Sequence, residues 1–174
     1  MRAGRERQRQ PAFSLRPHRS LPTLRQAAAS GRSEGKAMSK PSVHEALIYL
    51  MVIASASDRD MSDPELGRIG AVVRGWPVFE DFNADRIVEV AQDCQKRLNG
   101  AEGLEGVLGL VAGVLPERLR DTAYAAAFEV AAADLEIRLE EMRVLQLIRR
   151  SLDLDTLTAA AIAQGAKARH RTLT

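Results

Sequence analysis

The chain has very little cysteine, histidine and aromatic side chain, and each scarcity excludes a class of protein. Its one cysteine, Cys94, cannot form an internal disulfide, so a disulfide-stabilised secreted fold is excluded and a reducing compartment is expected. One cysteine and three histidines cannot supply a zinc site built from thiolate and imidazole ligands. We therefore expect a cytoplasmic protein without a zinc centre.

Long hydrophobic runs are lacking as well. The longest apolar segment, residues 46–56, is interrupted by Tyr49 and Ser55 and is shorter than the roughly 20 residues of a membrane span. Aromatic residues make up only 4% of the chain, whereas alanine and leucine are abundant, and this composition favours helices over sheets. We predict an all-α protein that is not itself transmembrane.

The small net charge of +2 combines two unlike parts. Residues 1–37 hold nine Lys or Arg and two acids, which leaves 16 basic and 21 acidic residues in the remainder, a net charge of −5. The high isoelectric point therefore belongs to the basic segment, and we expect no nucleic-acid binding by the folded domain.

Residues 1–41 form this basic tail, which has no apolar periodicity and is expected to be disordered. Three interpretations compete: an organelle-targeting segment, a basic arm for nucleic acid or anionic lipid, or upstream sequence from an overlong gene model. The third is favoured because Met38 stands just before the first structural signal, which places the true start near Met38.

Residues 42–168 carry the start and stop signals of about seven helices, followed by a frayed end over residues 169–174. Ser42 with Glu45, and Ser62 with Glu65, have the spacing of a capping box. The third, fourth and fifth helices are expected to start at Asn83, Leu104 and Pro116. A sixth helix is expected to run through Leu152, and Asp153 or Asp155 is expected to cap the seventh.

Helical spacing also predicts where individual side chains lie. Apolar residues cover more than one face of the first helix, so we expect it to be central and buried. Cys94 falls in the apolar stripe of the third helix and is expected to be a core residue, whereas His44 is expected on the surface. In the sixth helix the residues expected to point inward are Met142, Leu145, Ile148 and Leu152.

An acidic turn occurs twice, 76 residues apart, each time between two predicted helices. Residues 56–69 read ASDRDMSDPELGRI and residues 132–145 read AADLEIRLEEMRVL, which share the pattern D-x-[DE]-[MI]-x-x-x-E-[LM]-x-x-[IL]. The repeated acids are Asp58, Asp60 and Glu65 in the first copy and Asp134, Glu136 and Glu141 in the second. The chain is therefore predicted to contain two duplicated helix-turn-helix hairpins.

Sets of carboxylates suit hard divalent cations such as calcium or magnesium. Helix capping and the helix dipole are the competing explanation, and they account for Ser62 and Glu65 without any metal. They do not require Asp58 and Asp134 to recur upstream of the helices. An EF-hand is excluded because its sixth position needs glycine, whereas the sixth residue counted from Asp58 is Asp63.

The two copies resemble the A-D-G-x-[IV]-x-x-x-E signature of the tellurite-resistance TerB family. The matching stretches are residues 57–65, SDRDMSDPE, and residues 133–141, ADLEIRLEE, and the resemblance extends from about Val43 to Ala166. It implies a non-enzymatic, all-helical domain that binds a divalent cation, calcium rather than magnesium, and no organic cofactor. Carried over by position, the ligands are Asp58, Glu65, Asp134 and Glu141, with Asp60 and Glu136 added from their spacing.

The resemblance also implies a role in tellurium-oxyanion resistance and envelope stress, through protein partners at the inner membrane. One departure keeps an alternative open: the glycine of the signature is replaced by Arg59 and by Leu135. The alternative is a helical interaction module, of the type that accompanies co-chaperones, which has kept the fold and lost the metal. Catalysis has little support, because no nucleophile, histidine or phosphate-binding glycine loop lies near the acids.

Overall fold

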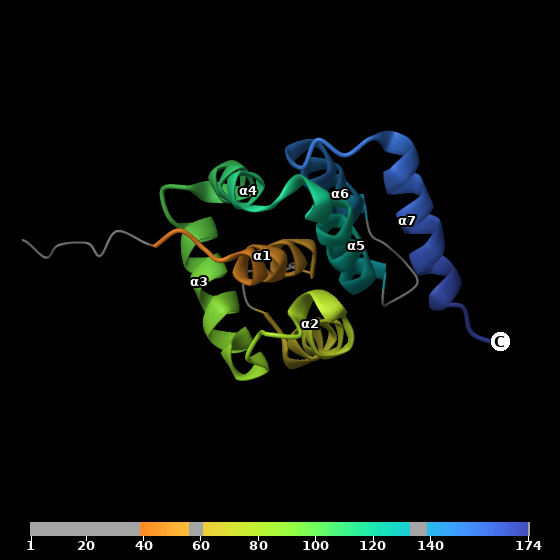
Figure 1. Cartoon of the computed structure of the whole chain (residues 1–174), viewed down its shortest axis with the longest axis horizontal. Helices are drawn as coiled ribbons and strands as arrows, with labels where there is room; N and C mark the ends of the chain where they lie inside the picture. Colours follow the sequence, from red (N-terminus) through yellow and green to blue (C-terminus); the bar gives the residue numbers. More distant parts are fainter. Residues whose placement is uncertain (1–38, 56–60, 133–138, 174) are drawn as a thin grey trace, which may run out of the picture. The chain divides into compact units, whose positions relative to one another are not determined.

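The computed structural model describes residues 39–55, 61–132 and 139–173, and the unit that begins at Ser39 is helical (Figure 1). The predictions for residues 1–38 lie outside the described residues. No strand occurs in the described part, which confirms the all-α prediction. The α-helices are α1 (Val43–Ser55), α2 (Asp63–Gly75), α3 (Ile87–Asn99), α4 (Gly103–Val114), α5 (Arg120–Ala131), α6 (Leu139–Ser151) and α7 (Thr156–Arg169). Three short 3-10 helices are η1 (Pro77–Phe79), η2 (Ala84–Arg86) and η3 (Glu117–Leu119).

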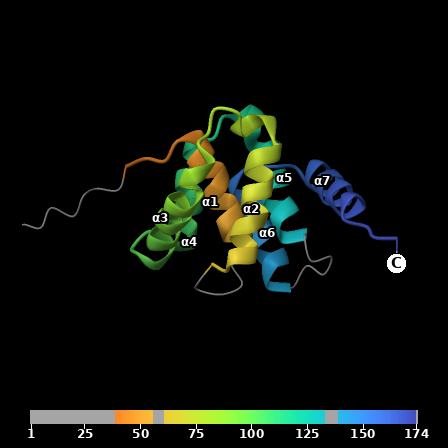
Figure 2. The same ribbon diagram turned by 90° about the horizontal axis from the view of Figure 1, so that it is seen from below.

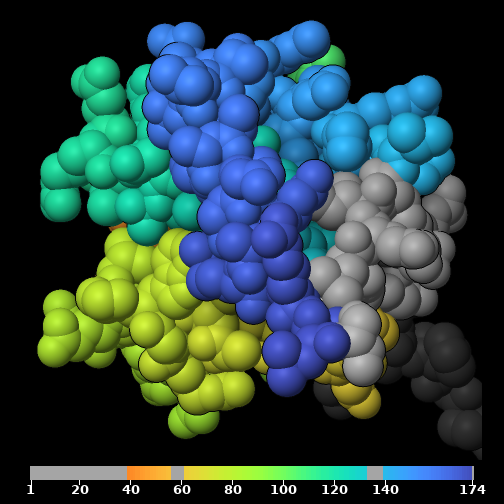
Figure 3. Space-filling view, turned by 90° about the vertical axis from the view of Figure 1, so that its right-hand side faces the viewer, coloured from red at the N-terminus to blue at the C-terminus, as the bar shows by residue number. Residues whose placement is uncertain are grey.

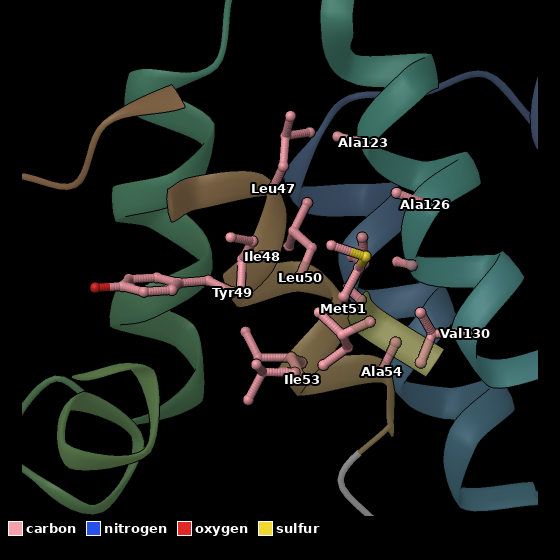
Figure 4. Packing of buried hydrophobic residues seen from close by; sticks show 14 of the residues in the cluster. Leu47, Ile48, Tyr49, Leu50, Met51, Ile53, Ala54, Ala123, Ala126 and Val130 are labelled. Carbon is pink, nitrogen blue, oxygen red and sulfur yellow. The ribbon is translucent and has the colours of Figure 1, made fainter. Parts of the chain in front are cut away.

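Helix α1 is the centre of the bundle, as its apolar composition predicted. Every residue from Ala46 to Ser55 is buried, and the helix packs most extensively on α5 while also contacting α2, α3, α4 and α6. The α5 side of this contact is made largely of alanines, including Ala123 and Ala126, which allow the two helices to approach closely (Figure 4). Branched and long side chains of α1 fill the space that these alanines leave.

Both predicted capping boxes form. The backbone amide of Ser42 donates to Glu45 Oε2 at 2.8 Å, and the amide of Glu45 donates to Ser42 Oγ at 3.2 Å. At the start of α2 the amide of Ser62 donates to Glu65 Oε2 at 2.7 Å. These bonds satisfy amides that the first turn of a helix leaves without intrahelical partners.

The segment between α2 and α3 differs from the sequence prediction in two ways. Asn83 does accept a bond from the amide of Asp85, but the turn it opens is the 3-10 helix η2, and α3 begins only at Ile87. His44 is not a solvated surface residue, because its Nε2 lies 3.0 Å from the Val78 carbonyl and its ring packs near Phe79 and Phe82. The loop folds back over α1 and covers this histidine.

In α6, Met142 does not point inward as predicted. Its side chain is 43% exposed, whereas Leu145, Ile148 and Leu152 are buried. Counting back along the helix from these three residues by helical spacing reaches Glu141, so Met142 is rotated away from the core. An apolar residue at the edge of the stripe was therefore assigned to the wrong face.

Helix α7 begins at one of the two predicted caps, and its end contacts α5. Asp155, one of the two predicted caps, accepts a bond from the amide of Thr158 at 2.9 Å and starts the helix. At the other end, Arg169 still belongs to α7, and Arg169 and His170 both contact Glu129 of α5. Figure 3 shows α7 lying across the surface, with α6 beside it. Glu129 therefore contacts the first two residues of the segment 169–174, and the expected fraying of that segment stays a prediction.

Cys94 lies in α3 against α1, and it is fully buried, as predicted. Its Sγ atom is 3.8 Å from the carbonyl oxygen of Tyr49. Burial, with a smaller contribution from the nearby Asp93 charge, raises the pKa of the thiol to about 12. At neutral pH the thiol is protonated, which excludes it as a nucleophile.

Candidate metal centre

The two hairpins, α1 with α2 and α5 with α6, present the starts of their second helices at the same end of the bundle. In Figure 2 the beginning of α2 and the beginning of α6 both lie toward the lower edge, while Figure 1 shows the two helices on different sides of α1 and α5. The long contact between α1 and α5 joins the two hairpins, and α2 also packs on α5 while α6 packs on α1. Side chains in the first turns of α2 and α6 are thus carried by helices that pack on the same core.

Glu65 lies in the first turn of α2, four residues before the buried Ile69, so it stands on the core-facing side of the helix. Its side chain is half-buried. Ser62 donates to its Oε2 twice, from the backbone amide at 2.7 Å and from the hydroxyl at 2.8 Å. Within the described residues Oε1 accepts no hydrogen bond, so a capped Glu65 still offers one oxygen to a cation.

Glu141 occupies the matching place in α6. It lies in the first turn, four residues before the buried Leu145, and its side chain is half-buried. The duplication seen in the sequence is therefore also a duplication of position and burial. Two glutamates, one from each hairpin, therefore stand on the core-facing side of the first turn of their helices.

Four of the six predicted ligands lie outside the described residues: Asp58, Asp60, Asp134 and Glu136. Among the residues that are described, no group of three or more His, Cys, Asp or Glu side chains could hold a metal ion. Glu65 and Glu141 are two members of the predicted set, and two carboxylates alone do not form a calcium site. The full ligand set stays a prediction.

A second polar cluster, centred on the buried Arg97 of α3, was not predicted from the sequence. Arg97 is 3% exposed; its Nε donates to Asp93 Oδ2 at 3.0 Å and its Nη2 donates to the Ser39 carbonyl at 2.6 Å. Asp93 also accepts a short bond from the Tyr49 hydroxyl. The four-residue spacing of Asp93 and Arg97 could have indicated an ion pair, but pairs at this spacing usually lie on solvated helix faces. This cluster ties the start of the unit to α1 and α3.

Two carboxylates near α1 have perturbed acidity. Burial raises the pKa of Asp93, but the Tyr49 hydroxyl and the Arg97 guanidinium outweigh it and hold the pKa below its ordinary value. Burial likewise raises the pKa of Glu45, and the bonds from Ser42 and from Arg86 together bring it below its ordinary value. Both groups are therefore harder to protonate in the folded protein than in the unfolded chain.

These lowered pKa values predict a loss of stability in acid. A carboxylate whose pKa is lower in the folded state stabilises the fold above its unfolded pKa, about 4, and that contribution is lost as pH falls through the folded pKa. We expect melting temperature to fall below about pH 4, and Glu45→Gln and Asp93→Asn each to make that fall shallower. Thermal melts from pH 7 to pH 2 test this, with Asp81→Asn as the control. An unchanged pH profile in both variants would contradict the assignment.

The described helices define a class: an all-helical bundle made of two joined hairpins, with one half-buried glutamate in the first turn of the second helix of each hairpin. No helix in the described part is long and apolar enough to cross a membrane. The chain belongs to the TerB family, since the family model described as "Tellurite resistance protein TerB" matches residues 44–164. Comparison of the chain with curated proteins and with solved structures gave no match.

Proposed function

We propose that this TerB-family protein is a non-enzymatic stress protein that binds a divalent cation through its two acidic turns and contacts protein partners at the inner membrane. The observation that carries the proposal is the equivalent placement of Glu65 and Glu141, each half-buried in the first turn of the second helix of its hairpin and four residues before a buried core residue. Family membership over residues 44–164 supports the stress role.

Calcium is the cation that the predicted ligands suit best. It accepts six to eight oxygen ligands in flexible geometry, whereas magnesium demands a near-ideal octahedron and keeps much of its water. Carboxylates supplied by two separate hairpins give many oxygens with little geometric precision. In this proposal Glu65 and Glu141 are joined by Asp58, Asp60, Asp134 and Glu136, and no organic cofactor is involved.

The non-enzymatic role is supported by the state of the usual catalytic groups. The described histidines are already engaged, His44 with the Val78 carbonyl and His170 with Glu129. The Cys94 thiol is buried and protonated. Tyr49 donates its hydroxyl to Asp93, and its pKa is raised by burial and by that carboxylate. None of these groups is placed to attack or to deprotonate a substrate.

Calcium is expected to raise the melting temperature of the full chain, and Asp58→Asn with Asp134→Asn to abolish the rise. A ligand that binds only the folded state stabilises it by about 2.7 kcal/mol at one hundred times its dissociation constant, a shift of several degrees. Melting curves with 1 mM EDTA, then with a calcium titration to about 5 mM, a range chosen to span weak sites, measure the effect.

The matched control is Asp81→Asn with Asp85→Asn, which removes two exposed carboxylates elsewhere on the surface and should leave the calcium response intact. If the melting curve of the wild-type chain does not move in calcium, the cation-binding half of the proposal is wrong. The protein is then a helical interaction module that has lost its metal.

A further inference from the structure

The outer face of α6 combines apolar and basic side chains in one line. Leu139, Arg143 and Leu147 follow each other at four-residue spacing, so they lie above one another along the helix, and Arg150 continues the line one turn further. The opposite face of α6 packs against α1, α4 and α5. The line is therefore directed away from the core.

The exposure of these apolar side chains is unusual for the described part of the chain. Leu139 is 74% exposed and Leu147 is 39% exposed, and Met142 at the edge of the same face is 43% exposed. Only three other large apolar side chains in the described part are exposed, and they are scattered over α3, α7 and the chain end. Exposed apolar residues gathered on a single helix mark a contact surface more often than scattered ones do.

The outer face of α6 also carries two exposed arginines, Arg143 and Arg150. Within the described residues neither of them forms an ion pair, as is also true of some arginines elsewhere on the surface. Two unpaired guanidinium groups beside exposed leucines favour a partner with acidic groups at the same spacing. Guanidinium groups bind carboxylates in a fixed, bidentate geometry, which would set the register of such a partner.

We propose that the outer face of α6 docks an acidic amphipathic helix of a partner protein. The partner's apolar residues, at three- and four-residue spacing, would pack between Leu139, Met142 and Leu147. Its Asp or Glu residues would meet Arg143 and Arg150. This inference rests on the interaction half of the proposed function and does not depend on cation binding.

Two other occupants are disfavoured. The first 37 residues carry a net charge of +7 and would be repelled by Arg143 and Arg150. An anionic membrane fits this face poorly, because the face lacks the aromatic residues that helices lying on a membrane use.

Photo-crosslinking in cells that make the full chain tests the proposal. The photoreactive residue p-benzoylphenylalanine replaces Leu147 on α6 or, as a control position, the exposed Leu157 on α7. We expect protein adducts from position 147 but not from position 157. The crosslinked segment, sequenced by mass spectrometry, should be a net-acidic stretch with apolar residues at helical spacing.

Charge reversal adds the decisive comparison. Arg143→Glu with Arg150→Glu should lower the adduct yield by about tenfold or more, whereas Arg118→Glu with Arg171→Glu, a matched pair of exposed arginines elsewhere, should not. Adducts with lipid alone, a basic crosslinked segment, or a yield that charge reversal leaves unchanged would each overturn the proposal.

The proposal and the broader function can fail separately. Partner adducts from position 157 but none from position 147 would reject the α6 face and keep a protein partner. No protein adducts from either position would reject both the face and the interaction. The calcium-dependent melting shift should persist in the Arg143→Glu, Arg150→Glu chain, and its loss would mean that this face belongs to the metal centre and not to a partner.

Discussion

Leu47→Ala is expected to lower the free energy of unfolding by about 2–5 kcal/mol, the range for leucine truncation in a well-packed core. Leu47 is fully buried, and Figure 4 shows its side chain projecting from α1 into the cluster that α1 forms with α5. The neighbouring α5 residues are mostly alanines, whose side chains are too short to move into the space that truncation would leave. The cavity term should therefore add to the lost transfer free energy.

Urea denaturation followed by helical circular dichroism measures this effect, and the melting temperature should fall by roughly 10 °C. Leu157→Ala is the control, because Leu157 is 81% exposed and its truncation should change stability by less than about 0.5 kcal/mol. Equal losses in the two variants would mean that the α1–α5 contact is not the centre of the core.

Arg97→Met is expected to cost about 2–3 kcal/mol. Methionine keeps much of the aliphatic volume but removes the bonds to Asp93, to Glu102 and to the Ser39 carbonyl. Breaking a buried ion pair by removing one partner typically costs about 3–5 kcal/mol, and the lower figure here reflects Asp93, whose side chain is 38% exposed and can be rehydrated.

A double-mutant cycle separates the ion pair from the other contacts of Arg97. Arg97→Met and Asp93→Asn are measured singly and together, and a coupling energy of at least about 1 kcal/mol is expected for residues that share a buried bond. Arg118→Met, at an exposed arginine, is the control. Purely additive effects would show that Arg97 stabilises the fold through Ser39 and Glu102 and not through Asp93.

The parts of the fold that could be predicted from the sequence are those fixed by local chemistry. The capping residues Ser42 and Ser62 need only their own helices, and both act as expected. The continuous apolar run of α1 likewise required no knowledge of its neighbours to indicate burial. Asn83 was correctly read as a cap, although the turn that follows it is 3-10 and not α-helical.

The errors arose where tertiary contacts decide. His44 is covered by aromatic rings 35 or more residues away in sequence, and Arg97 is buried by bonds that include a carbonyl 58 residues upstream. No local pattern carries such information. Met142 was misplaced for a simpler reason, since an apolar residue one position from the buried stripe was counted as part of it.

For the candidate metal centre, the sequence predicted a repeat, and the described structure adds the position of two of its members. The 76-residue offset relates Glu65 to Glu141 and also relates the buried Ile69 to the buried Leu145. The repeat could not predict how many carboxylates face one another. That number depends on the geometry of the two turns, which sequence periodicity does not determine. The aspartates of those turns remain the residues to test.

The burial of Cys94 makes its thiol a probe of how often the core opens. Its thiol is the only one in the chain, it lies in the seam between α1 and α3, and at neutral pH it is protonated. A thiol reagent can therefore react only when that seam separates, so the labelling rate reports how often the core opens. Dyes can label cysteines introduced on the surface in seconds, while Cys94 does not react. Distances between the two hairpins can therefore be measured with Cys94 left in place.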